Sequence, residues 1–422
     1  MRRSRLLSVV VVTLLPAAAW PQGSPVGPEF RVNTFTNNTQ ASPAVSFDAQ
    51  GNFVVVWGSV SQDYASTSGV FGQRFTSSGV PLGPEFRINT YTVGSQGGIS
   101  RAVASDPSGN FVVVWASGNQ DGSVAGVFGQ RFSSSGEPAG AEFRVNTYTT
   151  GGQGRPAVAA DSAGNFVVVW QSDLQDFSYL DVFAQRYAST GAPIGPEFRV
   201  NTTTVLSQTN PRVGSDSSGN FFVVVWESEV GDGSLGAVFG QRFAASGAPL
   251  GAQFRINTFT NAAQSSPDVA VDGSGNFVVA WQSGIVQDGY GFGIFGQRFA
   301  ASGAPVGPEF RVNTHTPSHQ IFPSVATDGS GNFVVAWQSL FQDGSDYGIF
   351  GQRYDSTGTP LGTEFQVNTT VLFDQEGCTV GADNAGNFIV LWHSWTSATS
   401  WNVFGQRYNP ILPVELMQIA IE

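Results

Sequence analysis

Short apolar runs recur along the chain at a nearly constant spacing. Each run is close to Phe-Val-Val-Val-Trp, and its closing Trp lies at positions 57, 115, 170, 226, 281, 337 and 392, which are 55 to 58 residues apart. Two further segments keep the same period: Gln-Arg-Phe or Gln-Arg-Tyr, and Glu-Phe-Arg-Val-Asn-Thr or a near variant. A fixed period of this kind is the signature of a repeat architecture. The pattern predicts seven copies of one structural unit.

Each unit is predicted to hold four short strands separated by turn residues. In the third unit we expect strands at 156–160, 166–172, 181–187 and 197–202, which we call A, B, C and D. The Asp-x-x-Gly-Asn turn between A and B suits a tight hairpin, because Asp binds backbone amides while Gly and Asn accept a positive φ. Strand B is apolar at consecutive positions, which is typical of a strand covered on both faces.

Sheets that are covered on both faces and repeated seven times predict an all-β, seven-bladed β-propeller with four antiparallel strands per blade. The repeat starts with a strand D at 29–34 and ends with strands A, B and C at 379–408. We expect the N-terminal strand D to join the last blade and close the ring, which removes two exposed edges. An open solenoid and two smaller β-domains are the alternatives. The propeller is assigned to 28–408, after a linker at 20–27 and before a tail at 409–422.

The first 19 residues have the order of a secretory signal peptide. Three Arg lie within the first five residues, an apolar run follows at 6–15, and Ala17, Ala18 and Ala19 form a small-residue cleavage site. We expect cleavage after Ala19 and a secreted or cell-surface protein; a buried N-terminal strand is the alternative. The apolar run is too short to span a bilayer, and we expect no membrane span after cleavage.

Composition narrows the classes of partner. Only 12% of the 422 residues are charged, the formal net charge is −12, and all 19 basic residues are Arg. Nucleic acid and anionic membranes bind clustered cations, so this charge argues against both. Cys378 is the one cysteine, which excludes an intramolecular disulfide. We expect a monomer that is stabilised by packing.

The repeat resembles a known group of blades. The order Pro-x-Val-x-x-Asp-x-x-Gly-Asn-Phe-Val-Val-Val-Trp, then Val-Phe-Gly-Gln-Arg-Phe, is similar over about residues 29–408 to secreted bacterial propellers of the sialidase-like, Asp-box kind. Those blades carry Ser-x-Asp-x-Gly-x-Thr-Trp between C and D, whereas 77–81 here reads Ser-Ser-Gly-Val-Pro. The sialidase set of three Arg with a Tyr–Glu pair does not stand out either, so that activity is not carried over. A closer resemblance is to uncharacterised secreted bacterial proteins with Val-Phe-Gly-Gln-Arg-Phe repeats, which imply no reaction.

Residues present in every blade are expected to be architectural, because one site does not need seven copies. Two recurrent features nevertheless map to the D–A and B–C loops, the face where propeller pockets usually open. A Gln follows each strand D at 40, 96, 153, 208, 264, 320 and 375, and a B–C loop Asp recurs at Asp63, Asp121, Asp176, Asp232, Asp288 and Asp343. Six loop carboxylates would attract Ca²⁺. The alternative is that these side chains merely cap their loops, with no cofactor.

Blade-specific residues are better candidates for binding. Blade seven replaces the Gln-Asp loop with 393–401, which carries His393, Trp395 and Trp401 among Ser and Thr. Aromatic faces cover the apolar surface of a sugar ring while hydroxyls bind its hydroxyl groups. The alternative is that these Trp seal the closing blade.

No catalytic constellation emerges from the sequence. His315 and His319 lie on a predicted loop, and Cys378 takes the place of a strand-A Pro as a small buried residue. The non-template loop carboxylates are Glu227, Glu229, Asp374 and Glu376, and a glycosidase would need two of them across a pocket. The sequence favours a secreted, non-catalytic propeller that binds a glycan or an extracellular protein. A polysaccharide hydrolase or lyase and a structural envelope protein are the alternatives.

Overall fold

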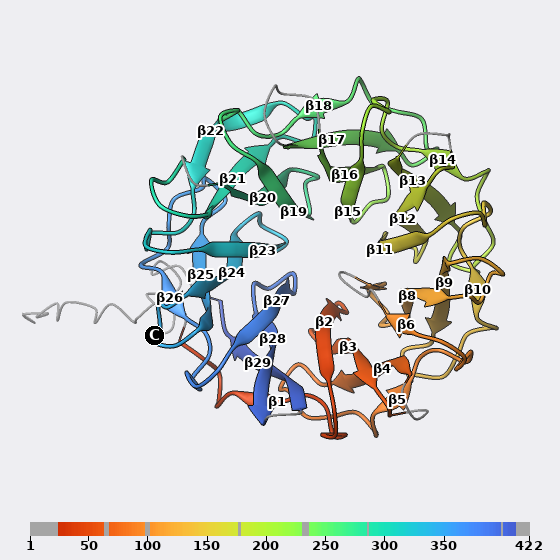
Figure 1. The fold of residues 1–422 in the computed structure, drawn as a ribbon, viewed down its shortest axis with the longest axis horizontal. Helices are drawn as coiled ribbons and strands as arrows, with labels where there is room; N and C mark the ends of the chain where they lie inside the picture. Colours follow the sequence, from red (N-terminus) through yellow and green to blue (C-terminus); the bar gives the residue numbers. More distant parts are fainter. Residues whose placement is uncertain are drawn as a thin grey trace, which may run out of the picture.

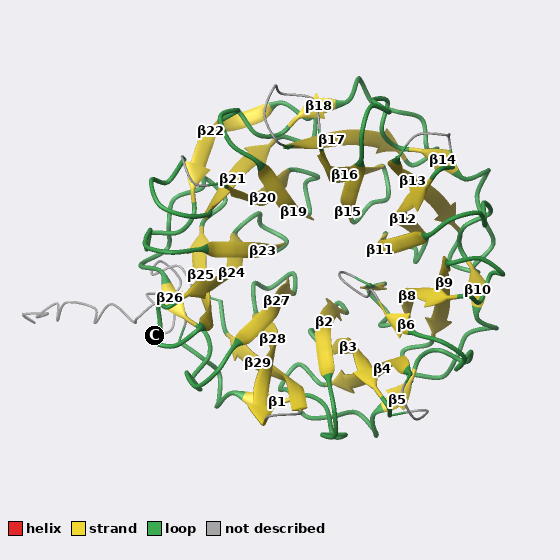
Figure 2. Cartoon of the chain, viewed as in Figure 1, coloured by secondary structure: helices red, strands yellow, loops and turns green. Residues whose placement is uncertain are grey.

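The computed structural model describes residues 24–62, 67–97, 102–175, 179–229, 236–284, 287–397 and 400–410. The expected signal peptide and most of the expected tail lie outside these residues. Seven antiparallel sheets are arranged around a central axis, as Figure 1 shows, and the described residues form strands and loops with no helix (Figure 2). The predicted all-β, seven-bladed propeller is confirmed. No helix in the described part of the chain is long and apolar enough to cross a membrane.

Each blade has an inner strand A, two long middle strands and an outer strand D, which has 7 residues in the fifth blade and 2 in the others. The first four blades are β2(Gln40–Phe47), β3(Phe53–Val60), β4(Ser68–Phe75), β5(Phe86–Arg87); β6(Gln96–Gly97) with β7(Val103–Ser105), β8(Phe111–Gly118), β9(Ala125–Phe132), β10(Phe143–Arg144); β11(Gln153–Ala160), β12(Phe166–Asp173), β13(Leu180–Tyr187), β14(Phe198–Arg199); and β15(Gln208–Ser215), β16(Phe221–Ser228), β17(Ala237–Ala244), β18(Phe254–Arg255). Blade two has its inner strand in two segments, β6 and β7, which both pair with β8.

The remaining three blades repeat this order. They are β19(Gln264–Val271), β20(Phe277–Ser283), β21(Gly293–Phe299), β22(Pro305–Arg311); β23(Gln320–Thr327), β24(Phe333–Leu340), β25(Tyr347–Tyr354), β26(Phe365–Gln366); and β27(Gln375–Ala382), β28(Phe388–Ser397), β29(Ser400–Tyr408) with β1(Phe30–Arg31). The third blade shows two differences from the expected bounds. Strand A starts three residues earlier than expected, and strand D is limited to β14 because only Phe198 and Arg199 pair with β13.

The two ends of the repeat lie in one sheet. Strand β1 pairs antiparallel with β29, with Phe30 opposite Gly405. The Asn33 side-chain oxygen accepts a hydrogen bond from the Val403 amide at 2.7 Å. The expected linker at 20–27 partly belongs to the blade, since Pro25 bridges to Tyr408 and the Val26 amide donates to the Arg407 carbonyl oxygen at 2.7 Å.

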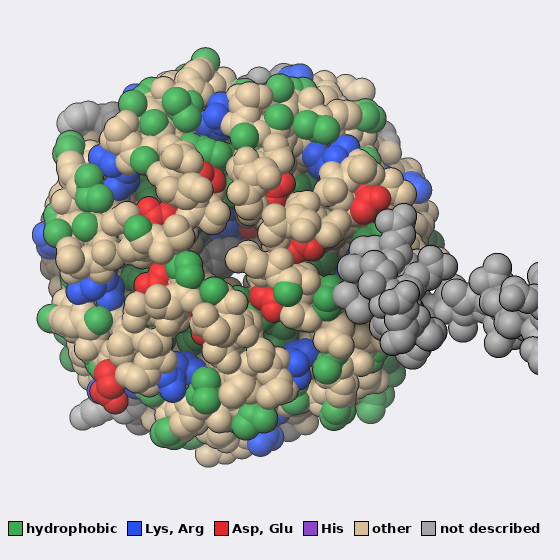
Figure 3. All heavy atoms as spheres, turned by 180° about the vertical axis from the view of Figure 1, so that it is seen from behind, with side chains coloured by type: hydrophobic (Ala, Val, Ile, Leu, Met, Phe, Trp, Pro, Cys, Tyr) green, Lys and Arg blue, Asp and Glu red, His purple; other side chains and the backbone are tan. Residues whose placement is uncertain are grey.

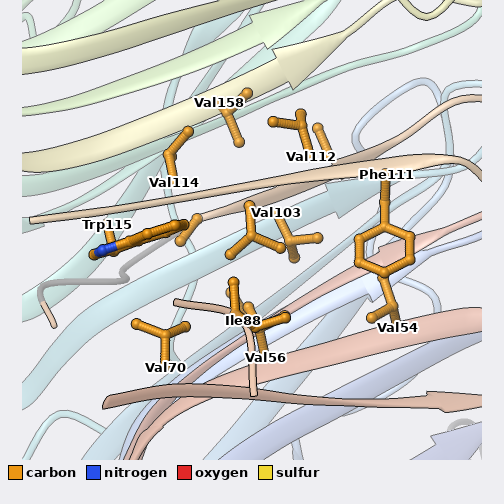
Figure 4. Close-up of a cluster of buried hydrophobic side chains, with 14 of the residues drawn as sticks. Val54, Val56, Val70, Ile88, Val103, Phe111, Val112, Val114, Trp115 and Val158 are labelled. Carbon is orange, nitrogen blue, oxygen red and sulfur yellow. The ribbon is translucent and has the colours of Figure 1, made fainter. Parts of the chain in front are cut away.

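Packing between neighbouring sheets explains the consecutive apolar residues of strand B. Along β16, Val224 and Trp226 pack against blade three, while Val223 and Val225 pack against blade five. Successive side chains of a strand point to opposite faces, so a sheet covered on both sides needs apolar residues at every position. Figure 4 shows the same arrangement between blades one, two and three, where Trp115 of β8 is fully buried among valines. The core therefore consists of the interfaces between adjacent blades.

Repeated polar residues stabilise the turns on the face opposite the D–A and B–C loops. In the first A–B turn, Asp48 Oδ1 accepts the Gln50 and Asn52 amides at 2.9 and 2.8 Å. The Arg of each Gln-Arg-Phe segment reaches the next blade; Arg74 Nη1, for example, donates to the Ser134 carbonyl oxygen at 2.5 Å. These turns follow the innermost strands, and Figure 3 shows acidic side chains around the central opening with Arg side chains farther out. The residues common to all blades are architectural, as expected.

Candidate functional site

The inner strands contain a recurrent irregularity beside the axis. The register between strands A and B shifts just after the first two residues of strand A, for example between Ala41 and Ala44 against β3. The third residue of strand A has a left-handed backbone there, with φ between 50° and 62°, in the six blades whose bulge is described. These residues are Ser42, Arg155, Asn210, Ser266, Phe322 and Gly377. A β-bulge re-aims a side chain and is often found beside active sites.

All six bulge residues line one cavity of about 600 Å³ on the axis. The cavity is also lined by residues that flank the bulges, among them Arg212, Asp268, Glu376 and Cys378. Strand A is the innermost strand of every blade in Figure 1, and its first residues lie next to the D–A and B–C loops. The expected binding face therefore contains a hollow whose wall differs from blade to blade.

One side of the axial cavity carries two Arg from blades three and four. Arg155 is exposed, and its Nη1 donates to Asn210 Oδ1 at 2.5 Å. Burial lowers the pKa of Arg212 to about 10, where this value already includes the opposing effect of Glu227 and the smaller lowering effect of Arg155. Asp268 of blade five is buried, and its Oδ2 accepts the Val325 amide at 2.8 Å. This side offers several hydrogen-bond donors with acidic groups close by.

The opposite side, from blades six and seven, is aromatic and acidic. Phe322 is 50% exposed on the axis, and Tyr347, Glu376 and His393 line the same cavity. Burial, together with the neighbouring Asp374, raises the pKa of the Glu376 carboxyl. Burial lowers the pKa of His393 to about 4, and its Nε2 lies 3.9 Å from Glu376 Oε2. At neutral pH this side therefore presents a neutral imidazole next to the Glu376 carboxyl group.

The side chain that follows the blade Trp supports the bulge of the next blade. Gln171 Oε1 accepts the Asn210 amide at 3.2 Å, and Gln282 Oε1 accepts the Phe322 amide at 2.9 Å. Glu227 accepts the Ser266 amide in the same way. These bonds satisfy amides that the register shift removes from the ladder. The bulge positions are therefore held in place by polar side chains of the preceding blade, of which Gln282 is buried and Gln171 and Glu227 are half-buried.

The predicted loop Asp residues bind their own loops where the structure describes them. Asp121 and Asp343 accept the strand-D Asn146 and Asn368 amides at 3.3 and 3.1 Å through Oδ2, while Oδ1 of Asp288 accepts the Tyr290 amide at 3.3 Å. Asp63, Asp176 and Asp232 lie outside the described residues. Among described residues, no three His, Cys, Asp or Glu side chains are grouped so as to hold a metal ion.

The recurrent Gln residues close the D–A loops. Each is buried and donates through Nε2 to a loop carbonyl oxygen; Gln40, for example, binds the Asn37 carbonyl at 2.8 Å, and Gln320 binds the Pro317 carbonyl at 3.0 Å. Their position at the start of strand A thus has a structural cause.

The expectation of a loop at 393–401 is wrong. Strands β28 and β29 extend through this segment as a hairpin, with Trp395 opposite Trp401. The two indole rings stack on each other with centroids 6.2 Å apart and an interplanar angle of 11°, and His393 meets the edge of Trp401 at 5.0 Å. Each Trp is half-buried. The alternation His-Ser-Trp-Thr was the signal for strands that sequence reasoning missed.

The other candidates are dispersed. His319 Nδ1 accepts the Phe292 amide at 3.3 Å in the D–A loop of blade six, and Glu229 binds the Ser207 amide at 3.3 Å. Cys378 is not the small buried residue expected: it is half-exposed, lines the axial cavity and lies 3.4 Å from the Phe322 carbonyl oxygen through Sγ. The cavity thus brings Glu376, Cys378 and His393 together and leaves Glu229 and His319 outside its lining.

Sequence reasoning missed the bulge residues, above all Arg155, Asn210 and Phe322. Their signal was present, because the third residue of strand A varies among Ser, Arg, Asn, Phe and Gly, whereas the Gln that opens the strand is the same in every copy.

No family model matches the chain, and no curated protein matches it. Among solved structures, a protein of unknown function from Dyadobacter fermentans DSM 18053 has a TM-score of 0.55 at 9% identity, covering 92% of this chain and 100% of its own. Hydrazine synthase of Kuenenia stuttgartiensis has a TM-score of 0.51 at 10% identity, covering 86% and 95%. An α-L-arabinanase of Penicillium chrysogenum has a TM-score of 0.49 at 14% identity, covering 79% and 100%. The likeness of this chain to these structures extends to the β-propeller fold alone.

Proposed function

We propose that the protein is an exported, non-catalytic binding propeller that holds a glycan in the axial cavity of its D–A/B–C face. The observation that carries the proposal is the bulge position. Six described blades place four kinds of side chain and one glycine at one structurally equivalent point of the cavity wall, while the residues that build the blades repeat. Packing alone would favour the same residue in each copy, so the variation supports a role in recognition.

The chemistry of the wall favours a saccharide over a purely apolar ligand. Arg155 and Asn210 supply donors and acceptors on one side, and Phe322 supplies an exposed aromatic face on the other. Sugar rings combine hydroxyl groups with apolar C–H faces, and an aromatic side chain beside polar groups suits both. Small pockets of this kind are largely preformed, which agrees with the hydrogen bonds that hold the bulges.

A retention assay on a panel of immobilised polysaccharides tests this proposal, with released oligosaccharides measured in the same samples. We expect retention without release. Phe322→Ser and Arg155→Ser should weaken retention, and both introduce a residue that the repeat itself uses at this position in Ser42 and Ser266. The control is Val80→Ser, which changes an exposed side chain on the opposite face. Equal retention by all four proteins, or none by the unchanged protein, contradicts the proposal.

One observation favours a second candidate, a polysaccharide hydrolase. Glu376 lies in the cavity beside Asp374, and a carboxyl group whose pKa is raised is a candidate general acid. Release of oligosaccharides that Glu376→Gln abolishes, while retention persists, would replace the binding role with this activity.

A further inference from the structure

Three Phe residues of blades six and seven hold backbone conformations that large side chains avoid. Phe322, Phe341 and Phe373 have φ of 52°, 64° and 66°. Positive φ is uncommon for residues other than Gly, Asn and Asp, and is strained for bulky ones. The three side chains are also 50%, 61% and 49% exposed. Neither backbone preference nor burial therefore explains why Phe stands at these positions.

Other blades show which residues the same positions accept more readily. The B–C loop position of Phe341 holds Ser61 in blade one and Asn119 in blade two, both at φ 61°. The D–A loop position of Phe373 holds Asn38 in blade one and Ser318 in blade six. Strain of this kind is concentrated at functional sites, where it persists because the surroundings enforce it. Leu174 and Leu206 are also exposed at the equivalent positions of blades three and four, with φ of 57°. The feature specific to blades six and seven is that the bulky residues at these positions are aromatic, which points to one surface that contacts a ligand.

The segments that carry these Phe residues are tied together. The Tyr347 amide at the end of the blade-six B–C loop donates to Asp374 Oδ1 at 3.3 Å, and the Trp395 amide donates to the Asp374 carbonyl oxygen at 3.1 Å. The Phe373 ring lies 5.4 Å from the Trp395 ring, and the Phe322 carbonyl oxygen faces Cys378 Sγ at 3.4 Å. The surface therefore continues from the axial cavity across the loops of blades six and seven.

The charged groups that blades six and seven add to this surface are acidic, whereas Arg155 and Arg212 of blades three and four lie on the other side of the axial cavity. Asp374 and Glu376 are half-exposed, and Asp346 is exposed in the blade-six B–C loop next to Tyr347. Carboxylates accept strong hydrogen bonds from hydroxyl groups, whereas they repel an acidic ligand. Aromatic faces with carboxylates between them suit sugar rings whose hydroxyls are free and unsubstituted by acid groups.

We propose that the ligand is a linear oligosaccharide without acid groups, whose successive rings contact Phe322 in the axial cavity and Phe341 and Phe373 over blades six and seven. This rests on the proposed function and deepens it: the site takes a segment of a chain rather than one sugar. Three aromatic faces on three separate segments are more than a single ring can contact. Affinity should therefore rise with the number of sugar units.

Calorimetric titration of the intact protein with oligosaccharides of increasing length tests this, using the polysaccharide it retains as the source. We expect affinity to rise over the first few units and then to level off. Phe341→Asn and Phe373→Asn should each weaken binding of the longer oligosaccharides by about three- to tenfold, with little effect on the shortest. Each variant should melt at the same temperature as the unchanged protein or higher, because Asn tolerates positive φ.

Leu174→Asn and Leu206→Asn are the matched controls, since these exposed Leu residues hold the equivalent positions in blades three and four, with φ of 57°. Both Leu variants should change the melting temperature in the same direction as the Phe variants and leave the affinity for the oligosaccharides unaltered. Absence of any saccharide binding overturns the proposed function itself. Binding that is independent of length, or that the Phe and Leu variants weaken equally, overturns only this inference. Tighter binding of uronic acid oligomers than of neutral ones overturns the ligand class.

Discussion

The His393 imidazole lies where a side chain at position 377 would begin: a Cβ on Gly377 would be 2.3 Å from His393 Cε1. Gly377 is the bulge residue of blade seven, with φ of 62°. In blades three to five the residue equivalent to His393 is Gln171, Glu227 or Gln282, and the bulges that these residues support carry side chains. Blade seven has thus exchanged a bulge side chain for an imidazole at the edge of the axial cavity.

This relationship predicts a strong coupling between the two positions. Gly377→Ser introduces the residue found at Ser42 and Ser266, yet it should lower the free energy of unfolding by about 2–4 kcal/mol, because the Cβ clashes with His393 and Ser is strained at positive φ. His393→Gln restores the residue of blades three and five and removes the clash. In the double variant most of the loss should be recovered.

Urea denaturation of the two single variants and the double variant completes a double-mutant cycle. Ser266→Gly serves as the control, since it makes the reverse exchange in blade five, where no imidazole is involved. Strictly additive losses from Gly377→Ser and His393→Gln would show that the two residues do not compete for space.

The burial of His393 also predicts a pH dependence. Its pKa is lowered from 6.5 to about 4, so the unfolded chain takes up the proton at a higher pH than the folded protein does. Neutral His393 therefore contributes stability that is fully present above pH 6.5 and is lost as the pH falls towards 4, in total about 3 kcal/mol. Glu376 acts in the opposite sense, because its raised pKa favours the folded state at low pH. Unfolding curves of the protein and of His393→Gln over this range separate the contribution of the histidine. If both proteins lose the same free energy of unfolding as the pH falls, His393 is not the cause of the loss.

The indole of Trp170 is fully buried between blades. Trp170→Ala should therefore cost about 3–5 kcal/mol of stability through the cavity that it leaves. Phe341→Ala, which removes an exposed ring, provides the comparison and should change the denaturation midpoint little. A midpoint that shifts equally in the two variants would mean that Trp170 contributes no packing.

The parts of the fold that sequence reasoning predicted depend on local rules that repeat. The bonds of Asp48 to amides two and four residues ahead follow from its turn, and the buried valines of β16 follow from a strand covered on both faces. Repetition made these signals easy to recognise, because seven copies carry the same residues at nearly the same spacing.

The site was harder to predict, because it depends on a register shift between strands. Nothing local to Phe322 indicates a left-handed bulge, and apolar Ile321 and Phe322 read as ordinary strand residues. The position of Trp395 and Trp401 was predicted wrongly because their segment takes the place of the Gln-Asp loop of the other blades, whereas the cross-strand pair makes a hairpin. Contacts between blades, such as that of Gln282 with the Phe322 amide, have no trace in either segment alone.

Strand β1 joins the first described residues to the last blade, which predicts that its removal destabilises the whole ring. Deletion of 24–34 removes the pairing of Phe30 with Gly405, the bond from the Val403 amide to Asn33 and the bonds that Glu29 accepts from Thr369. It also exposes β29 as an unpaired edge, which invites association with other chains. We expect a large fall in melting temperature together with oligomers on size-exclusion chromatography.

A point variant separates the pairing from the loss of chain. Asn33→Ala leaves β1 in place but removes a buried polar contact to blade seven, and Asn146→Ala removes the equivalent contact, to the Val127 amide, within blade two. Each loss should cost about 1–3 kcal/mol. If closure by β1 holds the ring, Asn33→Ala should lower the melting temperature more than Asn146→Ala does. In blade two a short connection of the chain still joins the two strands when the Asn146 contact is lost. No short connection joins β1 to β29. Equal shifts in the two variants, with an unchanged melting temperature after the deletion, would show that the ring stays closed without this strand.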